Sequence, residues 1–136
     1  MSAAPRPIPG AARPYEFPAV HRAVLANGVR VLVAPMPRLP LVTVLALVDA
    51  GAVTEPTGRE GIASLTARTL MEGTGTLGGI ALAEAFERLG TMVEAWADWD
   101  ASAARFTVTR SRLDAAFVQF AEVVRAPSFP AADVAR

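Results

Sequence analysis

The stretch from Gly58 to Thr74 constrains the fold most, because its apolar residues repeat with the period of a helix. Thr57 is the candidate N-cap residue, and Glu60 follows three residues later, at the spacing of a capping box. Gly73 comes after the last turn, where helices often end in a left-handed residue. The expected buried stripe consists of Ile62, Leu65, Thr66, Thr69 and Leu70. Such a one-sided helix has to pack against other elements of the chain.

Strand patterns before this helix supply part of the surface it needs. Residues 20–35 alternate around Asn27-Gly28, the preferred dipeptide of a two-residue type I′ hairpin turn. Their branched face is expected to be buried, and it comprises Val29, Val31 and Val33. Residues 41–50 are nearly all apolar, which predicts a central strand covered on both faces.

The second half of the chain continues with helices and another hairpin. Residues 79–89 predict a helix capped by Thr76, with Ile80, Ala83, Phe86 and Leu89 buried. Residues 91–110 alternate on both sides of a turn at 98–100, which predicts a hairpin. Its second strand should bury Ala104, Phe106 and Val108, and one of its two tryptophans should enter the core.

A third helix is expected over residues 111–125, with Ser111 as its cap. Its apolar stripe consists of Leu113, Ala116, Phe117, Phe120 and Val124. Pro130 is placed to begin another helix, which stops at Arg136 after less than two turns. The order of elements predicts an α+β fold, a largely antiparallel sheet with helices on one face, and an incomplete domain.

Composition excludes several classes of protein. The 13 basic residues, all arginine, balance 13 acidic ones, and no basic patch favours nucleic-acid binding. Without cysteine there is no disulfide, thiolate metal site or cysteine nucleophile. No apolar run reaches the length of a membrane span, and no signal peptide is visible. We therefore expect a cytoplasmic protein, or a periplasmic one if the start codon is misplaced.

Several residues suggest chemistry in isolation but favour a structural role in context. His21 is the only histidine, and no second ligand stands at useful spacing. The glycine-rich segment 73–79 lacks the Lys-Ser/Thr of a phosphate loop, so it predicts a connection between helices. Asp98 and Asp100 offer too few oxygens for a hard cation.

The frame of the first helix resembles the signature of the pitrilysin/insulinase-type zinc peptidases, G-[LI]-A-H-x-x-E-H-x-[LM]-x-x-G-T. The matching residues are Gly61, Ile62, Ala63, Leu70, Gly73 and Thr74. The two histidine positions of that pattern hold Ser64 and Arg68, and the glutamate position holds Ala67. The resemblance extends from Val20 to Arg136, since the hairpins and helices follow in the family's order.

The resemblance implies that zinc chemistry is lost. Such peptidases need two histidines four residues apart and a neighbouring glutamate as general base. Serine is a poor zinc ligand and arginine, always cationic, is none. The third ligand of the family, a later glutamate, would lie beyond Arg136. We therefore expect no catalytic residue, metal or cofactor in this chain, and no enzymatic activity of its own.

The family also contains pairs in which one subunit carries zinc and the other has lost the motif. The resemblance thus implies a non-catalytic subunit, or its N-terminal fragment, that forms a chamber and binds peptide or unfolded protein beside a zinc-bearing partner. It implies a substrate-binding strand edge at Glu94, Ala95, Trp96, Ala97 and Asp98. The expected organisation is a Pro/Ala/Arg-rich tail over 1–18 and a partial peptidase-like domain over 19–136.

Two other functions remain open at the level of sequence. One is a stand-alone interaction or scaffold domain without a peptidase partner. The other is a different enzyme that uses Asp98 and Asp100, which would require activity from the isolated chain.

Overall fold

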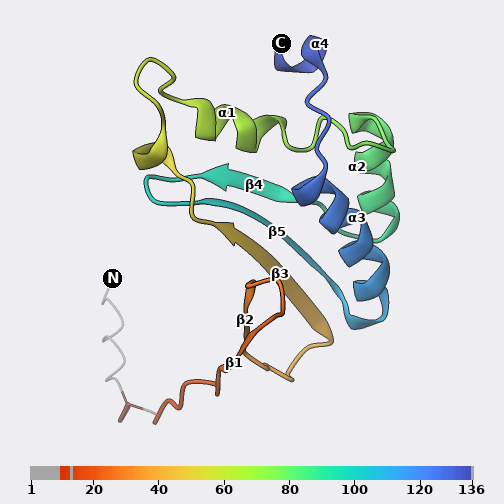
Figure 1. Cartoon of the computed structure of the whole chain (residues 1–136). Helices are drawn as coiled ribbons and strands as arrows, with labels where there is room; N and C mark the ends of the chain where they lie inside the picture. Colours follow the sequence, from red (N-terminus) through yellow and green to blue (C-terminus); the bar gives the residue numbers. More distant parts are fainter. Residues whose placement is uncertain (1–9, 13, 136) are drawn as a thin grey trace, which may run out of the picture. The chain divides into compact units, whose positions relative to one another are not determined.

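The computed structural model describes residues 10–12 and 14–135 (Figure 1). The chain divides into two compact units, residues 1–39 and residues 40–136. Most of the expected N-terminal tail, residues 1–9 and 13, lies outside the described residues. The rest of it, 10–12 and 14–18, contains neither helix nor strand.

The described residues of the first unit form an antiparallel hairpin, made of β1 (His21–Val24) and β2 (Arg30–Val33). The expected type I′ turn is wrong, because that turn needs positive φ at both central residues and Asn27 has a negative φ. Instead the Gly28 N–H donates to the Leu25 carbonyl at 2.9 Å, and Gly28 itself takes φ +85°. A longer loop with a glycine bulge thus replaces the two-residue turn.

The valine face of this hairpin is not buried as expected. Val29 and Val33 are exposed, and only Val31 is partly covered. The reason is the size of the element, since two strands of four residues cannot enclose a core between themselves.

The second unit is built on a three-stranded antiparallel sheet in the order β3-β5-β4 (Figure 1). Its strands are β3 (Leu41–Val48), β4 (Glu94–Ala97) and β5 (Ser102–Thr109). The second hairpin is therefore confirmed. The expectation that residues 41–50 form the central strand is wrong, because β5 occupies the centre and β3 lies at an edge.

In the described part of the second unit, four helices accompany the sheet: α1 (Ile62–Thr69), α2 (Gly79–Arg88), α3 (Leu113–Arg125) and the short α4 (Ala131–Val134). Two short 3-10 segments, η1 (Ala52–Thr54) and η2 (Arg110–Arg112), precede α1 and α3. The core lies between β5 and the helices α2 and α3, and it comprises Leu82, Phe86, Ala104, Phe106, Val108, Ala116, Phe120 and Val123. The α+β architecture is thus confirmed. Among the described residues, no helix is long and apolar enough to cross a membrane.

The faces of the helices are rotated relative to the predicted stripes. In α2 the buried residues are Leu82, Ala85 and Phe86, whereas Ile80 is 81% exposed. In α3 Val123 is buried, whereas Phe117 is exposed. Both helices carry apolar residues on more than one side, so periodicity alone does not fix which side meets the sheet.

The connection from residue 73 to residue 79 joins α1 to α2, as predicted, and is bonded to α3. The Thr76 hydroxyl donates to Glu122 Oε2 at 2.6 Å, and the buried Thr74 hydroxyl accepts the Leu77 N–H at 3.1 Å. The expected cap of α2 by Thr76 is therefore wrong, and neither α2 nor α3 has a side-chain cap. The carboxylate of Glu122 thus accepts hydrogen bonds from the hydroxyls of the loop, and its negative charge would repel an anion there.

Gly51 gives a direct test of how the sheet is joined to the segment before α1. A Cβ at this position would collide with backbone atoms of Trp99 and Ala101. We expect Gly51→Ala to lower the free energy of unfolding by about 2–3 kcal/mol, because backbone cannot move aside as a flexible side chain can. Urea unfolding followed by circular dichroism measures this.

The matched control is Gly75→Ala, since a Cβ there meets nothing within 4 Å. Equal stability losses in the two variants would contradict the close approach at Gly51.

Candidate functional site

The start of α1 is held by a carboxylate that the local sequence pattern did not identify. Glu55 accepts the Gly61 N–H at 2.7 Å through Oε2 and the Ala63 N–H at 2.9 Å through Oε1. Gly61 takes φ +94°, a left-handed conformation that favours glycine. The predicted start at Gly58 with Thr57 as cap is therefore wrong, and the helix begins at Ile62. Glu55 was missed because it lies outside the short spacing of a capping box.

Glu60 does not take part in a capping box either. Its carboxylate accepts the N–H of Gly58 at 2.9 Å. This hydrogen bond, followed by one from the N–H of Glu60 itself, lowers the pKa of the exposed Glu60 carboxyl. Glu60 thus shapes the loop before α1 rather than the helix.

The three degenerate motif positions lie on two sides of α1. Ala67 is buried, whereas Ser64 and Arg68 are exposed and one helical turn apart. The predicted stripe is wrong for Ile62, Leu65 and Thr66, which are exposed, and correct for Thr69, which is buried. The buried residues of the helix are Ala67 and Thr69, and Ala63 is partly buried. Small side chains at these positions allow the helix to approach the sheet closely.

Strand β4 presents an unpaired edge in the second unit. The Asp98 N–H donates to the Ala101 carbonyl at 2.8 Å, so these two residues form a hydrogen-bonded pair. Bonded and non-bonded pairs alternate in an antiparallel ladder, which places the bonds to β5 at Trp96 and Glu94. The backbone groups of Ala95 and Ala97 therefore point away from β5.

The other side of β5 gives the same register independently. The Arg110 N–H donates to the Pro40 carbonyl at 2.9 Å, next to the first pair of the β3–β5 ladder. Because hydrogen-bonded and non-bonded pairs alternate from this pair onward, the backbone groups of the even-numbered residues of β5 form hydrogen bonds with β3. The backbone groups of the odd-numbered residues, among them Ala103 and Arg105, therefore form hydrogen bonds with β4.

Helix α1 packs on β4 and β5, so the motif positions and the open edge belong to one region of the second unit (Figure 1). Trp96 is 39% exposed and Trp99 is 65% exposed, so the expectation that one tryptophan is core is wrong. The Arg105 guanidinium lies 5.5 Å from the centre of the Trp96 ring. The same guanidinium forms a salt bridge with Glu94 at 2.6 Å.

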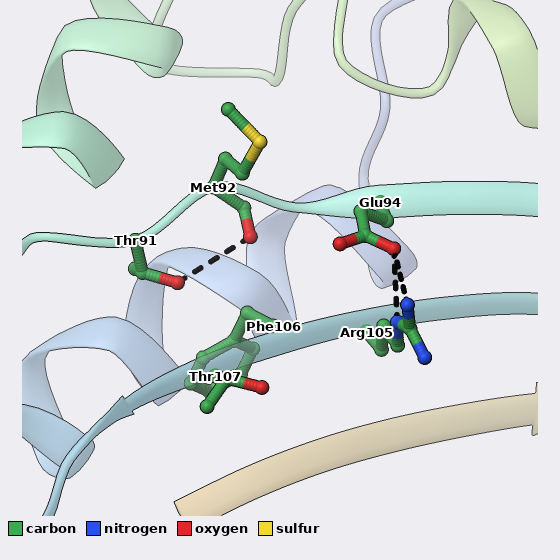
Figure 2. A pocket seen from close by; sticks show the side chains of 6 residues that line it. All are labelled: Thr91, Met92, Glu94, Arg105, Phe106 and Thr107. Carbon is green, nitrogen blue, oxygen red and sulfur yellow. Dashed lines mark hydrogen bonds and ion pairs between the residues drawn. The ribbon is translucent and has the colours of Figure 1, made fainter. Parts of the chain in front are cut away.

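A shallow cavity of about 180 Å³ lies beside this salt bridge, and Figure 2 shows the side chains that line it. Its lining residues are Thr91, Met92, Glu94, Arg105, Phe106 and Thr107. Because the only two charged groups that line it neutralise each other, the cavity offers no unpaired charge to a ligand.

The remaining candidates do not assemble into a catalytic group. Asp98 and Asp100 are exposed in the turn after β4, and Asp98 Oδ1 accepts the Trp99 N–H at 2.7 Å. His21 is exposed in β1 of the other unit. Across residues 10–12 and 14–135, no three His, Cys, Asp or Glu side chains lie together as a metal site would require.

A model of the insulinase family (peptidase family M16) matches residues 30–136 of this chain. The chain is a member of the insulinase family. The match begins in β2, so the resemblance expected from Val20 is shown from Arg30 onward. No curated protein sequence matches the chain.

Two solved structures are similar to this chain in fold. The crystal structure of a peptidase M16 inactive domain from Pseudomonas fluorescens matches with a TM-score of 0.81 and 31% identity. The match covers 86% of this chain but only 29% of the Pseudomonas fluorescens chain. A protease from Helicobacter pylori matches with a TM-score of 0.76 and 22% identity, over 83% of this chain and 27% of that one. The chain therefore spans less than a third of the length of either matched chain.

Glu55 yields a prediction about the start of α1. We expect Glu55→Ala to cost about 1–2 kcal/mol of unfolding free energy, because two backbone N–H groups lose their acceptor. Hydrogen exchange of the Gly61 and Ala63 amides should accelerate in the same variant. Thr57→Ala is the control, since no hydrogen bond of the Thr57 side chain is observed among the described residues, and it should leave both readouts unchanged. A larger effect from Thr57→Ala would restore the original capping assignment.

The motif positions yield a prediction about zinc. Serine and arginine supply no zinc ligand at the two histidine positions, and a guanidinium repels a dication. We therefore expect no stoichiometric zinc after dialysis against micromolar Zn²⁺, measured by metal analysis. Addition of Zn²⁺ should likewise leave the thermal unfolding midpoint unchanged. One tightly held zinc per chain would contradict the assignment of Ser64 and Arg68 as degenerate ligand positions.

Proposed function

We propose that this chain belongs to a non-catalytic subunit of an insulinase-family peptidase, which helps to form the chamber and binds peptide beside a zinc-bearing partner. The observation that carries the proposal is the open edge of β4 next to an α1 whose motif positions have lost their ligands. The likeness to an inactive M16 domain at 31% identity supports it.

Loss of hydrolysis follows from the side chains in α1. Water activation needs a metal that lowers the pKa of the bound water and a base that removes its proton. Ser64 and Arg68 do not supply the ligands, and the methyl group of Ala67 has no basic atom. The partner subunit is therefore the proposed source of both zinc and base.

Peptide binding does not depend on those groups. An extended peptide can pair with the outward N–H and C=O groups of Ala95 and Ala97, and main-chain hydrogen bonds accept most sequences. This tolerance suits a subunit that holds diverse peptides or unfolded chains for cleavage elsewhere. The exposed Trp96 offers a side-chain contact next to the same edge.

One surface favours a second function, a scaffold domain without a peptidase partner. The face of the sheet opposite the core carries exposed apolar residues on β3, namely Leu41, Leu45 and Leu47. Such a face is suited to binding another protein. Isolation of the protein from its native cells separates the two functions. A zinc-bearing companion of the same family supports the peptidase pair, whereas repeated isolation with other proteins and no such companion would support the scaffold.

The peptide edge can be tested by removing one hydrogen-bond donor. We expect Ala95→Pro to weaken binding of an unstructured peptide about fivefold or more, because the proline ring removes an outward N–H without touching the ladder to β5. Fluorescence anisotropy of a labelled peptide measures the affinity. Ala95→Gly is the matched control, since it keeps the N–H group. Unchanged binding in Ala95→Pro, with unchanged circular dichroism, would count against edge binding.

A further inference from the structure

We propose that Arg68 binds a carboxylate of the peptide held at the β4 edge, so that the preferred ligands are extended segments with an acidic side chain. This inference rests on the proposed peptide-binding function and adds the chemical class of the ligand. Arg68, at the second histidine position of the zinc pattern, would then bind the ligand rather than merely mark the loss of a zinc ligand.

Arg68 is an uncompensated cation in the described part of the chain. Its side chain is exposed, and no ion pair or side-chain hydrogen bond of it is observed among residues 10–12 and 14–135. Glu72 stands four residues later but beyond the end of α1 at Thr69, so the helical geometry of an i,i+4 pair does not continue to it.

The other charged side chains around β4 do not offer a second cation to a ligand. Arg105 is paired with Glu94 through two hydrogen bonds, at 2.9 Å from Nε and 2.6 Å from Nη2. The exposed aspartates Asp98 and Asp100 stand in the turn that follows the strand, where they repel an acidic ligand. On α1 and β4 the one unpaired charge is therefore the positive one of Arg68, which favours a ligand of the opposite sign.

The polar neighbour on the helix suits the same ligand. The Ser64 hydroxyl lies one turn before Arg68 on the same side of α1, and it too is exposed. A guanidinium and a hydroxyl together donate hydrogen bonds to a carboxylate, and charge-assisted bonds of this kind are about twice as strong as neutral ones. Since α1 packs on β4, the helix that carries these two donors lies beside the strand whose Ala95 and Ala97 backbone groups point outward.

The geometry of an added strand explains the specificity expected. Successive side chains of an extended peptide alternate between the two faces of the sheet, so only every second one is on the face that α1 covers. The main chain then provides affinity for many sequences, and one carboxylate on that face provides the preference. Because Arg68 is exposed to water, the preference should be modest and should fall as salt screens it.

The test compares two labelled ten-residue peptides of Ala, Thr, Ser and Val, one with a central Glu and one with Gln at that place. Their affinities for the 136-residue chain are measured by fluorescence anisotropy at low salt. We expect the Glu peptide to bind about fivefold more tightly. Arg68→Gln should abolish this ratio and leave the affinity for the Gln peptide unchanged. Arg110→Gln, which removes an exposed arginine after the far end of β5, should preserve the ratio.

Each outcome separates the ligand class from the proposed function. Equal affinities of the two peptides, both weakened by Ala95→Pro, would overturn the role of Arg68 and leave edge binding intact. Failure of both peptides to bind the folded chain would overturn both proposals. A ratio that persists in Arg68→Gln but disappears in Arg110→Gln would place the cation elsewhere and overturn the inference.

Discussion

The second unit depends on the burial of one face of β5 beneath the helices. Phe106 of β5 and Phe120 of α3 lie with their ring centres 5.0 Å apart, and Phe86 of α2 joins them in the core. Large aromatic side chains contribute most of the apolar area in a small core, so this contact orders the elements around it. Once β5 is central, β3 and β4 become edges, and the open edge of β4 follows.

Helix α1 is attached to this arrangement by polar groups as well as by packing. Its small residues Ala63 and Ala67 face the sheet, and Glu55 holds the first amides of the helix. In the zinc-binding pattern, position 67 carries the general base. Because this position holds the buried methyl group of Ala67, the inner side of the helix only packs and carries no catalytic group. The outer side keeps polar residues, Ser64 and Arg68, and thus keeps a capacity to bind something other than a metal.

Predictions from the sequence pattern were correct where apolar and polar residues separate clearly onto two faces, since only one orientation then buries the apolar face. Alternation along residues 102–109 predicted the buried face of β5 correctly, because a strand with polar residues on one side has a single favourable orientation. They failed for β3, where every residue is apolar or small enough to be buried. They also failed for α2 and α3, whose apolar residues allow two rotations about the helix axis. The predicted N-caps of α1 and α2 failed because Glu55 accepts the α1 amides from outside the capping-box spacing and Glu122 of α3 accepts the hydrogen bond of Thr76.

The sequence by itself determined the class of the fold, the family frame of the first helix and the absence of ligands at its motif positions. Those features depend on residue identity and local period, which are present before folding. The tertiary structure decided which strand is central, which edge is open and which side of α1 is covered. It also left Arg68 without a partner among the described residues while pairing Arg105 with Glu94. These outcomes depend on contacts between residues far apart in the chain, and the local spacing of residues does not predict such contacts.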